Sequence, residues 1–363
     1  MYRGIVFNFV FLLILRSFLL LRKPSHLVLR GTACGGFLRT LKAGTSTLRI
    51  EVCIASLRMT CVIMSNAKDF GGGTHMIYGA LEAGGTKMVC AIGDENGKIF
   101  DQISVPTKDP EDTMPAIIDY FRDKDIAALG IACFGPIELD KSSPDYGHIQ
   151  KTPKLLWAGY DIVGVMKESL KVPVGFDTDV NGSLLGEVTW GAAKGLSDVL
   201  YITIGTGVGG GILSGGNVVH GMLHPELGHM RLVKAENDPY EGKCPFHGTC
   251  LEGLAAGPAI EARWGAPARE LTDREEVWEL ESFYIAQALA TLILTISPKK
   301  IILGGGVMHV EKLFPMIRKK VLENLNGYLF TKELEDIDNY IIPAGLNDDQ
   351  GIMGAIKLAM DAE

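Results

Sequence analysis

The sequence predicts an α/β protein of two lobes that repeat one structural plan, and three observations lead to this prediction. The chain has 363 residues, more than a single hydrophobic core usually supports. Hydrophobic residues make up 47% of the chain and charged residues 21%, which is enough apolar material for two cores. One pattern, an apolar strand, a glycine-rich turn and a second apolar strand, occurs at residues 78–92 and again at residues 199–213.

The overall charge favours small-molecule partners over nucleic acid. The formal net charge is -8 and the isoelectric point is about 5.6, whereas a protein that coats phosphate backbones needs clustered Lys and Arg. We therefore expect no nucleic-acid partner. The seven cysteines are too few and too unevenly spread for a disulfide framework in a chain of this length. This usage favours a reducing, cytoplasmic compartment.

The first 75 residues differ from the rest. Residues 5–21 are almost wholly apolar and are interrupted by Asn8, Arg16 and Ser17, so this run could be a signal peptide or a short membrane anchor. A spanning helix needs about 20 apolar residues, however, and Arg16 would be costly in hydrocarbon. The alternative, which we favour, is that residues 1–75 lie outside the fold, because no periodic pattern there pairs with anything later. We expect no stable membrane insertion.

The first glycine-rich turn lies between two strands, as in a β-hairpin, and not between a strand and a helix. Gly84 and Gly85 would let the backbone come close to a polyphosphate. Thr86 offers a hydroxyl and an amide, and Lys87 supplies positive charge. An ordinary hairpin turn also accepts Gly-Gly-Thr, so the motif alone leaves both interpretations open.

The second turn, with Gly205, Thr206 and Gly207, repeats the plan with more glycine. Two such hairpins, each opening one lobe, suggest an internal duplication with the phosphates of one nucleotide held between the lobes. That is the layout of the actin-like ATPase and sugar-kinase fold, whose two lobes are duplicated, ribonuclease H-like domains.

A third apolar run, residues 301–303, ends in three glycines and follows a helix predicted over about residues 281–295. A strand that ends at Gly305 would leave room for a flat adenosine. A tight turn from strand to helix explains the same residues and does not exclude a nucleotide.

A nucleotide held in this way points to phosphoryl transfer. That reaction needs a carboxylate within hydrogen-bond reach of the acceptor hydroxyl, and Mg²⁺ to offset the charge of the phosphates. Asp179 is the candidate, because it follows a short strand after Pro173 and precedes a helix predicted from about Gly182. Open α/β folds place their chemistry at such strand ends. Asp177 is the competing candidate, and Asp179 could instead cap the helix.

Four side chains of metal-ligand type occur at zinc-site spacing. They are His229, Cys244, His247 and Cys250, the last three in a Cys-x2-His-x2-Cys arrangement. Two thiolates and two imidazoles complete a tetrahedral shell, which is typical of a structural zinc site. The loop between His229 and Cys244, residues 230–243, has little apolar periodicity, so a bound metal ion would be needed to hold it in place. Buried free cysteines beside a surface histidine remain the alternative.

The order of these motifs resembles the ROK family (repressors, open reading frames and kinases) over residues 76–361. Four segments carry the resemblance: residues 82–87 (EAGGTK), 178–182 (TDVNG), 204–211 (IGTGVGGG) and 224–229 (HPELGH). The resemblance implies an ATP-dependent sugar kinase that requires Mg²⁺ and carries a structural zinc ion. It implies that Asp179 is the general base and that four residues line the sugar pocket: Gly135, Asn181, Glu226 and His229. Phosphate would be cradled by Gly84, Gly85, Thr86, Lys87, Gly205, Thr206 and Gly207, and adenosine bordered by Gly257 and Gly305.

Two departures from the usual family pattern resemble its bacterial fructokinase branch. Glu82 stands where most ROK kinases have aspartate, and residues 244–250 have the form Cys-Pro-Phe-His-Gly-x-Cys. The branch implies fructose as acceptor at its 6-hydroxyl. A glucokinase or mannokinase with the same machinery remains the alternative. A DNA-binding repressor is disfavoured because residues 1–75 lack a basic recognition-helix pattern, and a sugar sensor without turnover is a third possibility.

The resemblance also divides the chain. A small lobe would contain residues 76–190 plus 346–363, and a large lobe residues 191–345 with the zinc loop at 229–250. The final segment, residues 349–359, is predicted to be helical and to pack on the first lobe. By resemblance we expect a homodimer.

Overall fold

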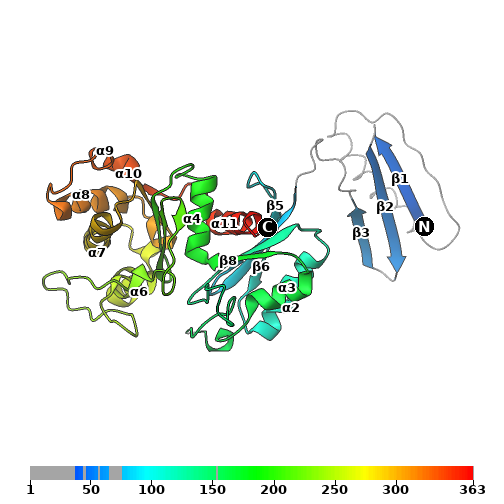
Figure 1. The fold of residues 1–363 in the computed structure, drawn as a ribbon, viewed down its shortest axis with the longest axis horizontal. Helices are drawn as coiled ribbons and strands as arrows, with labels where there is room; N and C mark the ends of the chain where they lie inside the picture. The colour runs from blue at the N-terminus through cyan, green and yellow to red at the C-terminus, as the bar shows by residue number, and fades with distance from the viewer. Residues whose placement is uncertain (1–36, 44–45, 56–57, 65–75, 153, 363) are drawn as a thin grey trace, which may run out of the picture. The chain divides into compact units, whose positions relative to one another are not determined.

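The computed structural model describes residues 37–43, 46–55, 58–64, 76–152 and 154–362 (Figure 1). The chain forms two compact units, divided between Thr74 and His75. The first unit contains an antiparallel sheet of β1 (Phe37–Ala43), β2 (Ser46–Ala55) and β3 (Arg58–Met64) in that order. These strands were not predicted from the sequence, although residues 47–52 alternate polar and apolar side chains as strands do. The apolar run at residues 5–21 lies outside the described residues.

The second unit begins with a five-stranded sheet in the order β6-β5-β4-β7-β8. Its strands are β4 (Tyr78–Ala83), β5 (Lys87–Gly93), β6 (Ile99–Pro106), β7 (Ala128–Cys133) and β8 (Val174–Thr178). The first three strands are antiparallel, and β4, β7 and β8 run parallel. One face of this sheet packs against α2 (Pro110–Arg122) and α3 (Ile162–Leu170), and the other face, which carries several alanines, packs against α11 (Gln350–Met360). This sheet and its helices are the first lobe.

The second lobe repeats this topology. Its sheet has the order β11-β10-β9-β12-β13 and the same strand directions. The strands are β9 (Val199–Ile204), β10 (Val208–Ser214), β11 (Asn217–Val218), β12 (Lys300–Gly304) and β13 (Ile341–Pro343). Both glycine-rich turns therefore join the first two strands of a sheet, which confirms the two predicted hairpins and the duplicated α/β fold.

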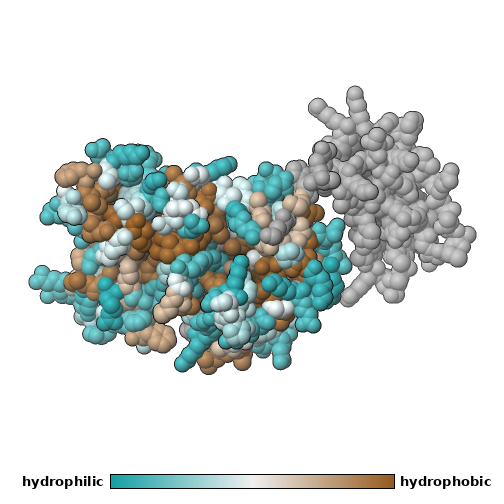
Figure 2. All heavy atoms as spheres, in the orientation of Figure 1, coloured by the Kyte–Doolittle hydropathy of each residue, from teal (hydrophilic) through white to brown (hydrophobic). Residues whose placement is uncertain are grey.

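Helices cover the second sheet on both faces. One face packs against α5 (Leu251–Ala255), α7 (Glu275–Ile296) and α8 (Leu313–Leu325), with α6 (Gly257–Trp264) in the same core. The remaining short elements are α9 (Lys332–Glu335), α10 (Ile337–Tyr340), η1 (Leu155–Trp157), η2 (Leu227–His229), η3 (Ala268–Glu270) and η4 (Gly306–His309). Among the described residues, only α7 is long and apolar enough to cross a membrane, and 56% of its apolar window is buried, as in a core helix. Figure 2 shows hydrophilic side chains along the outer edges of both lobes.

The helix α4 (Asp179–Thr189) connects the lobes, because it packs against α11 and also against β9 and β10. It starts at Asp179 and not at the predicted Gly182, since the Thr178 hydroxyl accepts a hydrogen bond from the Asn181 amide at 3.1 Å. Thr178 is therefore the cap, and Asp179 is the first helical residue. The predicted C-terminal helix is confirmed as α11, which crosses α4 so closely that a Cβ atom on Gly354 would lie 1.7 Å from the Gly182 oxygen.

Candidate active site

The two hairpin turns have compact backbones with exposed threonines at their tips. In the first turn the Gly84 amide donates to the Lys87 carbonyl at 3.1 Å. A Cβ atom on Gly84 would lie 2.6 Å from that same carbonyl oxygen, so the turn requires glycine there. In the second turn the Gly205 amide donates to the Gly207 carbonyl at 2.9 Å. Such tight turns leave neighbouring amides free to face an anion.

Three of the predicted nucleotide-binding glycines lie together in the second lobe. The Gly257 amide at the start of α6 donates to the Gly205 carbonyl at 2.8 Å. Gly305 has a φ of 88°, and a Cβ atom there would lie 2.5 Å from the Ile204 oxygen. The ends of β9 and β12 and the start of α6 therefore meet at one place. A cavity of about 670 Å³ opens beside Gly305 and Met308, and one of about 150 Å³ opens beside Thr206 and Pro258.

The two candidate aspartates have different surroundings, although they are two residues apart. The Asp177 carboxylate is buried and accepts hydrogen bonds from the Thr178 amide (2.7 Å) and the Asn181 side chain (2.7 Å). Its second oxygen lies 3.0 Å from Nε2 of His220. The Asp179 carboxylate is half-buried and accepts from the Val180 amide at 2.9 Å. Burial raises the pKa of Asp179 to about 6.

Several carboxylates lie close enough to influence one another. Burial, and then the charge of Asp179, raises the pKa of Glu82 to about 7. Burial chiefly raises the pKa of Glu226, with Glu252 adding to the rise, and the charge of Glu226 in turn acts on Asp179. Glu252 accepts a hydrogen bond from the Val208 amide at 3.1 Å, beside the second turn. These acids therefore form a chain of mutually interacting carboxylates that begins beside the first glycine turn and ends beside the second.

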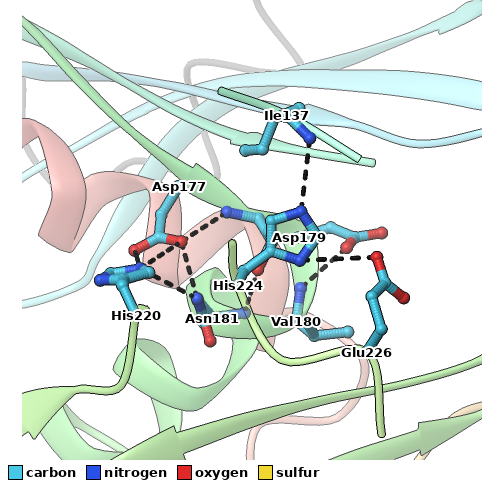
Figure 3. Close-up of polar contacts among 9 residues, drawn as sticks. Ile137, Asp177, Asp179, Val180, Asn181, His220, His224 and Glu226 are labelled. Carbon is cyan, nitrogen blue, oxygen red and sulfur yellow. Dashed lines mark hydrogen bonds and ion pairs between the residues drawn. The ribbon is translucent and has the colours of Figure 1, made fainter. Parts of the chain in front are cut away.

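Three of the predicted sugar-pocket residues come from separate segments (Figure 3). A Cβ atom on Gly135 would lie 3.0 Å from the ring of His224 and 3.7 Å from Oε1 of Glu226. The His224 ring in turn lies between the Ile137 amide and the Glu226 carboxylate (Figure 3). Asn181 is 1% exposed, and its amide donates to Asp177, so its side chain supports that carboxylate.

The four predicted metal ligands form one cluster, with all ligand atoms within 4.8 Å of one another. Nδ1 of His229 lies 3.7 Å from the Cys244 sulfur and 3.6 Å from the Cys250 sulfur, and Nδ1 of His247 lies 3.6 Å from the Cys244 sulfur. Tetrahedral zinc with ordinary bond lengths would separate nitrogen and sulfur ligands by about 3.6 Å. The residues therefore fit a zinc ion. Cys250 also caps α5 by accepting from the Gly253 amide at 3.4 Å.

Four residues at the site were not identified from the sequence. Lys154 lies against the first turn, because a Cβ atom on Gly85 would be 3.0 Å from its side chain. Glu252 lies against the second turn, and His220 and His224 lie against Asp177 and Glu226. Lys154, Glu252 and His220 reach their partners from distant segments, so no local spacing marks them. His224 lies only two residues from Glu226, but its position beside Gly135 and Ile137 depends on the fold.

The family profile described as "ROK family" matches residues 78–362. A fructokinase from Pediococcus pentosaceus is 46% identical over 287 residues, which cover 79% of this chain and 99% of that protein. A fructokinase from Zymomonas mobilis is 43% identical over 296 residues, covering 79% of this chain and 97% of that protein. Among solved structures, the ROK hexokinase from Thermus thermophilus has a TM-score of 0.64 at 27% identity and covers 78% of this chain and 98% of that one.

Proposed function

The chain belongs to the ROK family of sugar kinases, and on that premise we propose that it is a fructokinase, which transfers the γ-phosphoryl group of ATP to the 6-hydroxyl of fructose. The observation that carries the proposal is the extent of the match, since two proteins named fructokinase align along nearly their whole length at above 40% identity. The carboxylate, the two glycine turns and the metal-type cluster all lie within the matched residues.

Asp179 is the general base in this proposal. It would accept the proton of the sugar hydroxyl as that oxygen attacks phosphorus. Its pKa of about 6 leaves it ionised at neutral pH and brings its basicity closer to the working pH than an exposed aspartate has. Asp177 suits the role less well, because both of its oxygens already contact donors or His220.

Four residues contribute to the sugar pocket in this proposal. Glu226 and Gly135 lie next to each other beside the His224 ring, and the Glu226 side chain is 42% exposed and able to accept hydrogen bonds from sugar hydroxyl groups. His229 offers Nδ1 to the metal-type cluster, which leaves its second ring nitrogen for the sugar. Asn181 contributes through Asp177, to which its amide donates.

ATP would lie between the two turns. Gly84 would shape the first turn, since its amide already donates to the Lys87 carbonyl. The amide of Gly85, with Thr86 and Lys87, would face the phosphates from the first lobe. From the second lobe, Gly205, Thr206 and Gly207 would do the same, and Gly257 and Gly305 would border adenosine. Mg²⁺, when bound, offsets phosphate charge and polarises the transferred group.

Zinc has a structural role in this proposal. Its four protein ligands would leave no open position for substrate, and the segment that it joins, residues 229–250, contains little regular secondary structure. The zinc ion would fix the ring of His229 and hold the loop against α5. We further propose a cytoplasmic homodimer, as the family resemblance implies.

The second candidate function is phosphorylation of glucose or mannose by the same residues, since the solved relative from Thermus thermophilus is named a hexokinase. A coupled assay of ADP release with fructose, mannose and glucose separates the two. We expect fructose to give the highest kcat/KM and fructose 6-phosphate to be the product. A higher kcat/KM with glucose or mannose would show that this sugar, and not fructose, is the preferred substrate. No turnover with any hexose would refute the assignment as a sugar kinase.

A further inference from the structure

The segment between β11 and η2, residues 219–226, connects the second lobe to the first through two histidines. Nε2 of His220 lies 3.0 Å and 3.2 Å from the two oxygens of Asp177, at the end of β8 in the first lobe. His224 receives a hydrogen bond from the Ile137 amide, also in the first lobe, at 3.3 Å. Figure 3 shows both histidines reaching toward β8 and the turn before Ile137. The segment that carries Glu226 is therefore held on the first lobe at two points.

The contacts of His224 determine where its proton lies. A backbone N–H can only donate, so Nε2 of His224 must accept from Ile137, and in the neutral ring Nδ1 then carries the hydrogen. Nδ1 lies 3.5 Å from Oε1 of Glu226 and faces it. His224 is 6% exposed, and burial lowers its pKa, which agrees with a neutral ring.

One oxygen of Glu226, Oε1, faces Nδ1 of His224, and the side chain as a whole is 42% exposed and so within reach of a ligand. Gly135 lies against the same ring and beside the same carboxylate, since its Cβ atom would be 3.0 Å from Cε1 of His224 and 3.7 Å from Oε1 of Glu226. The His224 ring therefore contacts both the Glu226 carboxylate and the Gly135 turn, two neighbouring parts of the proposed sugar pocket.

We propose that His224 is a positioning residue for the hexose: it orients the Glu226 carboxylate relative to the Gly135 turn and so contributes to the choice among hexoses. This inference rests on the proposed function, because it needs a sugar that Glu226 contacts. Hexoses differ in the direction of single hydroxyl groups, and a site that fixes a buried acceptor discriminates more strongly than one that lets it rotate.

Two substitutions of His224 distinguish a residue that orients the Glu226 carboxylate from one that only fills the space beside it. His224→Phe keeps a ring of similar size and removes both polar contacts, whereas His224→Asn loses volume and keeps a donor near the position of Nδ1. We expect His224→Phe to raise the dissociation constant for fructose about 10-fold or more, in the range expected for a lost hydrogen bond to a charged group. We expect His224→Asn to bind fructose more tightly than His224→Phe. The opposite order would show that His224 only fills space and would overturn the proposal.

The experiment measures sugar binding by calorimetry and turnover in parallel, on the full chain. KM for ATP and the zinc content should stay within twofold of the parent chain, which also shows that the variants fold. In a Glu226→Gln background, His224→Phe should change the dissociation constant by less than about twofold, because the group that His224 orients is gone. An equal effect in both backgrounds would contradict the inference. His148→Phe and His148→Asn are matched controls, since the His148 ring contacts the Asp145 carbonyl within its own turn.

Binding of mannose and glucose is measured for the same variants. If the unsubstituted chain prefers one of these, the proposed fructose specificity fails, and the coupling between His224 and Glu226 is then measured with the preferred sugar. If the unsubstituted chain binds fructose most tightly, His224→Phe should reduce the ratio between the dissociation constants for the other hexoses and that for fructose. An unchanged preference together with unchanged affinity would refute the role of His224 and leave the proposed function intact.

Discussion

Two chain segments connect the lobes: one contains Ala192, and the other contains Gly345 and Leu346. Replacing Glu187 should weaken the hydrogen bonds that hold both of these segments. Glu187 lies near the end of α4 and is 0% exposed. One of its oxygens accepts from the Ala192 amide at 2.7 Å, in the first connection between the lobes. The other accepts from the amides of Gly345 (2.8 Å) and Leu346 (3.3 Å), in the second connection. A single carboxylate therefore joins two segments that are far apart in the sequence.

The geometry gives the size of the effect. Glu187→Ala removes the acceptor of three backbone donors, and each loses about 1–3 kcal/mol if it stays unpaired. Gly345 is exposed, so water replaces part of the loss there. We expect the free energy of unfolding to fall by about 2–4 kcal/mol. Glu187→Gln keeps one oxygen and places an amide donor opposite another donor, so we expect a smaller loss of about 1–2 kcal/mol.

Equilibrium unfolding in urea measures these changes, with Glu323→Ala as the matched control. Glu323 has a side chain that is 60% exposed, and its lysine partner lies 3.9 Å away, so its loss should change stability by less than about 0.5 kcal/mol. We expect KM for fructose to rise in Glu187→Ala, because Glu187 helps to hold the two lobes, which both line the proposed sugar pocket, in one arrangement. If Glu187→Ala unfolds at the same urea concentration as Glu323→Ala, the proposed link between the connections is wrong.

Three further predictions concern pH, zinc and helix packing. The pKa of Asp179 rises from 3.8 to about 6 on folding, so kcat/KM for fructose should fall as pH drops below about 6, where the base gains a proton. Because the folded chain binds this proton more tightly, the stability that the protonated carboxyl contributes should be lost as pH rises from about 4 to 6, and Asp179→Asn should flatten that part of the urea-unfolding profile. Cys250→Ser should abolish zinc binding, measured by mass spectrometry of the metal, whereas Cys90→Ser in the first lobe should keep the metal; zinc retained by Cys250→Ser would exclude the proposed ligand set. Gly354→Ala should cost more than about 3 kcal/mol, since its Cβ atom would lie 1.7 Å from the Gly182 oxygen, whereas Gly221→Ala meets nothing closer than 3.9 Å and should be tolerated; equal urea midpoints for the two would refute the packing argument.

Local features of the sequence predicted much of the fold. A glycine turn between two apolar strands is a short-range pattern, so both hairpins, β4–β5 and β9–β10, could be predicted. The zinc-type ligands could be predicted for the same reason, since three of the four lie within seven residues. The start of α4 was predicted three residues too late, because the capping role of Thr178 depends on one hydrogen bond to Asn181.

Contacts between distant segments could not be predicted. Asp177 and Asp179 look equivalent in the sequence, and their surroundings differ through burial and through contacts such as that of Asp177 with His220, which comes from the second lobe. Lys154 likewise reaches the first glycine turn from a distant loop. The three strands within residues 37–64 were not predicted, because no periodic pattern there pairs with a later segment, although residues 47–52 alternate as a strand does.

The most direct test of the central claim compares two neighbouring aspartates in one assay. Fructose 6-phosphate formation is measured at saturating ATP and fructose for the unsubstituted chain, Asp179→Asn and Asp177→Asn. If Asp179 is the general base, Asp179→Asn should still bind fructose and should lose turnover by about 10²–10⁴-fold. Asp177→Asn should keep a larger fraction of the turnover of the unsubstituted chain. Near-normal turnover in Asp179→Asn, or a greater loss in Asp177→Asn, would contradict the assignment of Asp179.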